Sequence, residues 1–187
     1  NMRSNNFKLI GTTLATTDLS SMILDDVLFE NILINKGCKL DNTEIVTGVM
    51  DNVEPVPSTT TGLKLRNVHI KNSSMEASTF NNFNLDNVTF ENSKLNQTTF
   101  NDLKYKNLTL DRTELFDIKF KNSDIFSINY KDIKTNSPEI LIQVYMNDFT
   151  ENPSIDINKL NALVENIHSP SDIEYLYYVH FDILNQL

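Results

Sequence analysis

A five-residue spacing of large apolar residues is the feature that most constrains the fold of this chain. From residue 65 to residue 130 every fifth residue, here called a centre, is large and apolar, fourteen times in succession. The centres are Leu65, Ile70, Met75, Phe80, Leu85, Phe90, Leu95, Phe100, Tyr105, Leu110, Leu115, Phe120, Ile125 and Tyr130. A strand repeats every two residues and a helix every 3.6, so neither explains a period of five. A solenoid whose sides are five residues long does explain it.

The residues two places before the centres indicate how many sides the solenoid has. They repeat in the order large, large, small, small, as in Leu63, Val68, Ser73, Ser78 and then Phe83, Val88, Ser93, Thr98. This superperiod of about twenty residues predicts four sides, with residues twenty apart stacked in columns at ~4.8 Å per coil. Phe80, Phe100 and Phe120 form one predicted column.

Asparagine is unusually abundant, with 26 residues in a chain of 187. It recurs two places after the centres, at Asn67, Asn72, Asn82, Asn87, Asn92, Asn107 and Asn122. Asn tolerates turn conformations and stacks in hydrogen-bonded ladders. Corners between the sides of a solenoid therefore explain the Asn excess without any binding site.

This pattern resembles the pentapeptide-repeat family, whose motif is a small residue, Asp or Asn, Leu or Phe, and two variable residues. "STFNN" at 78–82 is one such unit, although Ala is rare here at the small position. The resemblance implies a right-handed quadrilateral β-helix. We predict a mainly β chain, with a pentapeptide-repeat β-helix of about six coils in residues 1–136 and an α-helical cap, or the start of a helical domain, in residues 137–187.

Two interruptions modify the solenoid toward the N-terminus. The frame runs through Leu9, Leu14, Leu19, Leu24, Phe29 and Ile34, slips by one residue at "INKGCKL", and resumes at Leu40, Ile45 and Met50. We expect Gly37 to take the extra residue as a bulge. "DNVEPVPSTTTG", residues 51–62, contains two Pro, a Gly and a Ser/Thr run, which predicts a mobile loop insertion. Such a loop is either a tolerated surface insertion or a functional one.

The five-residue period stops after Lys134, and helical patterns follow. "SPEILIQVYMNDF" has Ser137 as a candidate N-cap and Leu141, Val144 and Tyr145 on one face. Two further helices are expected, one in "DINKLNALVENIH" and one in "SPSDIEYLYYVHFDILNQL". The first helix is expected to cover the open end of the β-helix. The end at Leu187 without a polar tail suggests a piece of a longer protein.

The net charge of -9 is distributed unevenly along the chain. Residues 1–136 hold 17 acidic and 15 basic residues, whereas residues 137–187 hold 8 acidic residues and one basic residue. The predicted solenoid is therefore nearly neutral and the predicted helical region strongly acidic. No stretch approaches the ~18 uninterrupted apolar residues of a membrane span, so no membrane contact is expected.

The sequence contains no constellation typical of an enzyme. No Ser-His-Asp arrangement, phosphate loop or metal-ligand spacing is present, and His69, His168 and His180 are scattered. The single cysteine, Cys38, occupies a small inward position in the repeat, where a buried unreactive thiol is favoured over a nucleophile. We predict no catalytic residue, no cofactor, no metal and no nucleic-acid partner for this chain.

The layout of a β-helix followed by an acidic helical region resembles the SopA-like family, secreted bacterial effectors that act as HECT-type E3 ubiquitin ligases in host cells. In that family the β-helix recruits the target, a central helical region binds the E2 enzyme, and a cysteine in the last lobe carries ubiquitin. The resemblance implies a substrate-recruiting module that binds a host protein, with an E2 bound only through missing domains. It also implies secretion by a bacterium into the host cell; otherwise a cytoplasmic location is expected. Cys38 lies in the repeat and does not match the ubiquitin-carrying cysteine.

The alternative hypothesis is a DNA-mimicking pentapeptide-repeat protein that binds DNA gyrase or another type II topoisomerase. Such mimicry needs a strongly acidic solenoid, because a DNA-binding groove is built to neutralise dense negative charge. The near-neutral solenoid predicted here counts against this alternative.

Outward apolar residues and exposed lysines are the candidate partner-binding positions. Ile23, Leu28 and Leu33 directly precede centres, and Phe116 directly follows one. Contact with a missing N-terminal segment explains the first three as well as partner binding does. Lys104 and Lys106, on the outside of the solenoid, complete the set.

Overall fold

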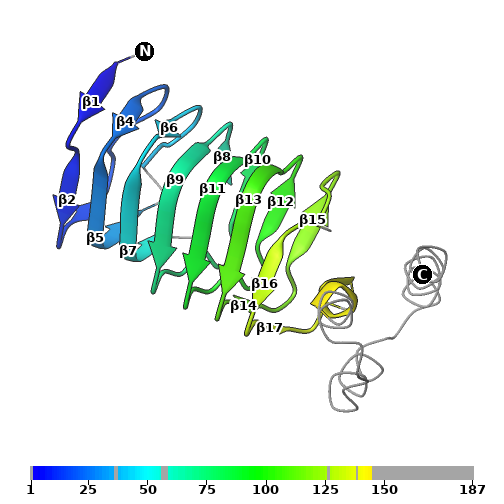
Figure 1. The fold of residues 1–187 in the computed structure, drawn as a ribbon. Coiled ribbons are helices and arrows are strands. Elements are labelled where there is room, and N and C mark those ends of the chain that lie inside the picture. Colours follow the sequence, from blue (N-terminus) through cyan, green and yellow to red (C-terminus); the bar gives the residue numbers. More distant parts are fainter. Residues whose placement is uncertain (1, 36–37, 56–58, 126, 138, 145–187) are drawn as a thin grey trace. The chain divides into compact units, whose positions relative to one another are not determined.

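Short parallel strands wind around a common axis in the computed structural model, which describes residues 2–35, 38–55, 59–125, 127–137 and 139–144. The chain divides into two compact units, residues 1–134 and residues 135–187. The first unit is the solenoid (Figure 1). Its coils fulfil the prediction of a right-handed quadrilateral pentapeptide-repeat β-helix of about six turns.

Five strands are eight residues long and form most of the solenoid wall: β5 (Val27–Ile34), β7 (Gly48–Pro55), β9 (Lys64–Lys71), β11 (Asn84–Glu91) and β13 (Lys104–Asp111). The remaining strands have two or three residues: β1 (Arg3–Asn5), β2 (Lys8–Ile10), β3 (Thr13–Leu14), β4 (Ile23–Asp25), β6 (Glu44–Ile45), β8 (Thr59–Thr61), β10 (Thr79–Asn81), β12 (Thr99–Asn101), β14 (Glu114–Leu115), β15 (Lys119–Lys121), β16 (Asn129–Lys131) and β17 (Lys134–Thr135).

Each coil pairs with the coils before and after it, twenty residues away over most of the solenoid. In the largest sheet the order is β1-β4-β6-β9-β11-β13-β16, with β2, β3, β5 and β7 joined at its side; β15-β12-β10-β8 form a second sheet and β14-β17 a third. β11 pairs in parallel with β9 and β13, so that Leu85 lies between Leu65 and Tyr105. Figure 1 shows these long strands side by side along the solenoid. The backbone N–H and C=O groups at the strand edges within the solenoid thereby pair with those of neighbouring coils.

The centres point into the solenoid and form its core. Twelve of the fourteen are buried, and Tyr105 and Phe120 are partly buried. The ring centroids of Phe80 and Phe100 are 5.5 Å apart and those of Phe100 and Phe120 are 5.4 Å apart, with an angle of 16° between the planes in both pairs. The predicted aromatic column is confirmed, and each buried Leu or Phe contributes roughly 1.5–3 kcal/mol.

Residues with a left-handed backbone form the corners between sides. Of the 19 non-Gly residues with positive φ in the described part of the chain, eleven are Asn. Several donate from their Nδ2 to the side-chain oxygen of the Asn one coil away, as Asn92 does to Asn72 at 2.9 Å and Asn87 to Asn67 at 2.9 Å. Asn adopts this conformation more readily than other L-residues. The structural explanation of the Asn excess is therefore confirmed.

The predicted frame slip is confirmed by the strand register. Leu14 pairs with Ile34, twenty residues away, whereas Asp18 pairs with Lys39, twenty-one residues away. The extra residue thus enters between residues 34 and 39. Gly37, where we expected the bulge, lies outside the described residues.

The predicted loop at residues 51–62 is wrong. Residues 51–55 belong to β7, and Thr59–Thr61 form β8, which pairs with β10. Val53 is fully buried. The five-residue frame continues through Pro55 and Thr60, which take the centre positions, and Asn52 and Gly62 form corners with φ of 52° and 70°. The coil is not evident from the sequence because Pro55 and Thr60 occupy centre positions that hold large apolar residues in the other coils.

The second unit is described only at residues 135–137 and 139–144. Thr135 is the last residue of β17. Residues 139–144 are helical, and the backbone nitrogen of Leu141 donates to the carbonyl oxygen of Ser137 at 3.0 Å. Leu141 and Val144 are three residues apart in this helix, so they share a face as predicted, and both are half-buried. Ile140, Ile142 and Gln143 are buried. The other two predicted helices and Tyr145 lie outside the described residues. The covering of the solenoid end stays a prediction.

Candidate protein-binding sides of the solenoid

Three long strands each contribute to two neighbouring sides of the solenoid. β9, β11 and β13 bend at Asn67, Asn87 and Asn107, whose φ values are 54°, 55° and 55°. The residues before these corners form what we call the first side, and the residues after them form the second side. Because the strands are in register, outward side chains on both sides form straight columns with the spacing of the strands, about 4.8 Å.

The first side carries a hollow of about 480 Å³, here called the basic trough. Its polar residues are Glu44, Lys64, Arg66, Asn84, Asp86, Lys104, Tyr105 and Lys106, and Leu65 and Leu85 complete its lining. Asn84 lies between Lys64 and Lys104, and Asp86 lies between Arg66 and Lys106.

Side-chain length explains why this sheet surface is hollowed. The middle strand, β11, presents the short side chains of Asn84 and Asp86, while its neighbours β9 and β13 present long cationic side chains. All four cationic residues of the trough are exposed. The short pair forms the floor of the trough, and the long pairs form its two walls.

The charges of the trough are only partly neutralised. The guanidinium Nη2 of Arg66 forms an ion pair with Oε1 of Glu44. Lys64, Lys104 and Lys106 have no ion-pair partner among the described residues. With four cations and two carboxylates, the trough has a formal charge of +2.

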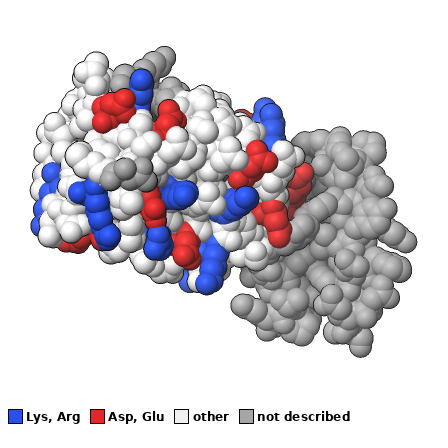
Figure 2. All heavy atoms as spheres, turned by 90° about the horizontal axis from the view of Figure 1, so that it is seen from above, with Lys and Arg blue, Asp and Glu red and all other residues white. Residues whose placement is uncertain are grey.

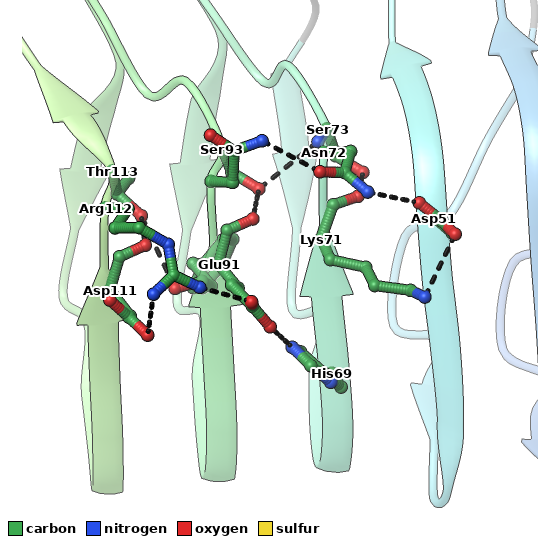
Figure 3. Close-up of polar contacts among 12 residues, drawn as sticks. Asp51, His69, Lys71, Asn72, Ser73, Glu91, Ser93, Asp111, Arg112 and Thr113 are labelled. Carbon is green, nitrogen blue, oxygen red and sulfur yellow. Dashed lines mark hydrogen bonds and ion pairs between the residues drawn. The ribbon is translucent and has the colours of Figure 1, made fainter.

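Ion pairs between coils dominate the second side (Figure 3). Lys71 Nζ lies 3.1 Å from Asp51 Oδ2, and Arg112 pairs with Glu91 and, at 3.3 Å between Nη1 and Oδ2, with Asp111. When His69 is protonated, its Nε2 forms a further ion pair with Glu91 Oε2 at 2.7 Å. The carboxylates of this side are therefore held by cations of the same solenoid.

Asp51 shows the electrostatic effect of this arrangement. The Asn72 amide donates to Asp51 Oδ1 at 2.9 Å, and Lys71 lies beside the same carboxylate. The Asn72 hydrogen bond, followed by Lys71, lowers the pKa of Asp51 below its ordinary value of 3.8. The ionised form of Asp51 is thus favoured in the folded chain.

The structure does not gather the predicted partner-binding residues into one patch. Ile23 and Lys104 share a column of the first side, and Lys106 lies beside them on the same side. Leu28 is half-buried on the second side and pairs with Val49.

The two remaining candidates lie on a third side, far apart along the solenoid axis. Leu33 is 40% exposed and lies in the N-terminal coils, between Thr13 and Glu54. Phe116 is 38% exposed and follows β14. Of the six candidates, only Lys104 and Lys106 line the basic trough.

Sequence reasoning named Lys104 and Lys106 but missed Lys64, Arg66, Asn84 and Asp86 as members of the same site. The signal was present, because "KLR", "NLD" and "KYK" recur at residues 64, 84 and 104. Aligning the chain at intervals of twenty places the three tripeptides side by side and shows long cations flanking short polar residues. A search at intervals of five does not reveal this.

Metal-binding groups and the Cys38 thiol are the other candidates for chemistry in the described residues. No group of three or more His, Cys, Asp or Glu residues within them is arranged to hold a metal ion. Cys38 is half-buried rather than fully buried, and desolvation, followed by Asp18, raises the pKa of its thiol. A raised pKa lowers the thiolate fraction, which disfavours a nucleophilic role. Within the described part of the chain, no helix is long and apolar enough to span a membrane.

No family model matches the sequence, and no curated protein matches it. Solved structures do resemble the fold. A trypsin-treated variant of QnrB1, a plasmid-mediated fluoroquinolone resistance protein, is 12% identical with a TM-score of 0.30, covering 77% of this chain and 87% of that chain. Full-length QnrB1 is 8% identical with a TM-score of 0.25, covering 77% and 98%. HetL, a pentapeptide-repeat protein involved in heterocyst differentiation regulation in the cyanobacterium Nostoc sp. strain PCC 7120, is 10% identical with a TM-score of 0.23, covering 71% and 84%.

Proposed function

We propose that this chain is a non-catalytic β-solenoid that binds another protein through the outer surface of β9, β11 and β13. The observation that supports this most directly is the in-register surface of these strands, which hold charged side chains at fixed positions around a hollow of about 480 Å³. A surface that is already ordered loses little conformational entropy on binding. Such a surface therefore suits recognition of a protein partner.

Charge distribution disfavours the DNA-mimic alternative. Residues 1–136 have a formal charge of -2, from 17 acidic and 15 basic residues. Figure 2 shows acidic and basic side chains interleaved over the side of the molecule that it presents. On the second side, Asp51 and Glu91 are held by Lys71 and Arg112. A mimic of DNA needs a dense acidic surface instead.

The ligase-effector hypothesis has only the sequence resemblance behind it. A host-protein target and a location in a host cell remain hypotheses, as does a type II topoisomerase partner.

Site-specific photo-cross-linking of the purified full chain tests the proposal. One variant carries p-benzoylphenylalanine in place of Asp86, in the trough, and a matched variant carries it in place of Thr99, on β12. We expect one protein in an extract of the source cells, or of a host cell, to cross-link saturably from position 86 and not from position 99. Equal cross-linking from both positions, or no saturable product, contradicts the proposal.

Two purified assays then test the topoisomerase alternative and the absence of catalysis. Inhibition of gyrase supercoiling by the full chain supports the topoisomerase alternative. Discharge of ubiquitin from a loaded E2 by the full chain contradicts the non-catalytic part of the proposal. We expect neither activity.

A further inference from the structure

We propose that the basic trough binds an extended acidic segment of the partner protein, lying along β11. This inference deepens the proposed function and rests on it. The occupant is a peptide segment rich in Asp or Glu. The shape of the trough, its unneutralised charge and the spacing of its cations all favour such an occupant.

The shape of the trough suits an extended chain. The floor follows β11 through Asn84 and Asp86, and the walls follow β9 and β13 on either side. Because the strands are parallel and in register, the trough runs along the strand direction. Wall residues facing each other, such as Lys64 and Lys104, are two strand spacings apart, about 9.6 Å. An extended backbone, which needs about one strand spacing (4.8 Å) on either side, fits over β11 between the walls. A helix with its side chains is about 10–12 Å wide, more than the whole distance between β9 and β13.

The charge of the trough favours carboxylates. Lys64, Lys104 and Lys106 lack ion-pair partners among the described residues, in contrast to Lys71 and Arg112 on the second side, which pair with Asp51 and Glu91. On the second side the cations are neutralised by carboxylates of the solenoid, whereas on the first side unpaired cations remain on both walls. Complementary charge between a surface and its partner steers encounter and fixes register.

The spacing of the cations matches an extended acidic peptide. Lys64 and Arg66 are two residues apart on one strand, which places their Cα atoms about 6.6 Å apart. Lys104 and Lys106 repeat this spacing on the opposite wall. Successive side chains of an extended peptide point alternately to opposite sides, and those on one side repeat at the same distance. Carboxylates of one peptide can therefore reach cations on both walls.

Asp86 sets the selectivity of the trough. Its carboxylate lies in the floor between Arg66 and Lys106. There it repels a carboxylate of the bound peptide, and so lowers the affinity for a uniformly acidic ligand. Asn84, in contrast, offers an amide donor in the same floor. We infer that the favoured segment places its carboxylates near Asn84 and a neutral residue near Asp86.

Fluorescence anisotropy with the full chain and a labelled octaglutamate peptide tests this inference, with octaglutamine as the neutral probe. Octaglutamate is expected to bind, more weakly as salt rises from low to physiological concentration, and octaglutamine is expected not to bind. The double variant K104A/K106A should weaken octaglutamate binding about fivefold, since each exposed ion pair contributes only modestly. Asp86→Asn should strengthen binding about threefold, because it removes a like charge.

K119A/K121A is the matched control. It removes two exposed lysines at the same two-residue spacing from β15, outside the trough, and should change binding less than twofold. An equal loss of octaglutamate affinity in the two double variants would mean general charge attraction and would overturn the proposal. An unchanged affinity in Asp86→Asn would also overturn it.

The cross-linking experiment is independent of this test. If a protein partner cross-links at position 86 and the K104A/K106A substitutions do not reduce its binding, the proposed function stands and only the acidic-segment inference is lost.

Discussion

The two halves of the solenoid share one backbone frame but differ in how well side chains fill it. From Leu63 to Asn122 the coils repeat every twenty residues without a break, and Phe80, Phe100 and Phe120 stack face to face. In the N-terminal half the register changes once from twenty to twenty-one residues. Here the column that holds the Phe stack contains Thr60, beside a cavity of about 40 Å³.

This difference shows that the backbone frame and the stability of each coil have different causes. The coil that contains Pro55 and Thr60 keeps its strand pairing and its corner residues although neither position holds a large apolar residue. Backbone hydrogen bonds to neighbouring coils and left-handed corners therefore maintain the frame. The apolar centres then determine how strongly each coil is held.

Deletion of residues 51–62 should have the largest effect. It removes twelve residues, which is not a whole number of coils, so every later column loses its partner in the N-terminal half. We expect the loss of cooperative unfolding, measured by circular dichroism during heating. Deleting residues 83–102, one complete coil of twenty, is the control and should keep a single transition, because residue 103 then continues the column of residue 83. Retention of cooperative unfolding after the first deletion would show that the segment is a loop after all.

Phe100→Ala should destabilise the chain by roughly 3–5 kcal/mol, since it opens a cavity in the middle of the aromatic column. Thr60→Ala, in the same column of the N-terminal half, should cost less than about 1 kcal/mol, because Thr60 is only partly buried beside an existing cavity. Urea unfolding of the two variants gives both free energies. Similar losses at the two positions would contradict the difference between the halves.

Thr60→Leu should stabilise the chain by about 1 kcal/mol, because filling a cavity recovers about 24 cal/mol per Å³ and this cavity measures about 40 Å³. Thr79→Leu is a suitable control, since Thr79 lies on the outer face of β10 next to the buried Phe80. Thr79→Leu should not raise the free energy of unfolding. An increase in both variants would indicate strand propensity rather than cavity filling as the cause.

Sequence reasoning predicted the frame, the aromatic column and the corner asparagines because each repeats many times. It failed at residues 51–62 because Pro and Thr removed the apolar signal while the backbone frame persisted. It also failed to assemble the basic trough, since the trough depends on columns that join Lys64, Asn84 and Lys104 across three coils. Individual outward residues carry no such information when they are considered one at a time.

The smallest expected effect concerns acid stability on the second side. Because the folded-state pKa of Asp51 is lowered below 3.8, the unfolded chain binds more protons in this range. The contribution of Asp51 is fully present above its ordinary pKa and is lost as the pH falls through the lowered value. Asn72→Ala, which removes the largest cause of the shift, should reduce the stability difference between pH 6 and pH 3. An unchanged difference in urea midpoint would contradict this account of Asp51.

We expect the preformed trough on the first side to be the surface at which the chain binds its partner. Amide chemical-shift mapping by NMR, with octaglutamate added to the full chain, is a direct test of this claim. We predict that the changes concentrate on Lys64–Arg66, Asn84–Asp86 and Lys104–Lys106, with β10, β12 and β15 unaffected. Changes centred on those three strands, or spread evenly over all sides, would contradict the claim.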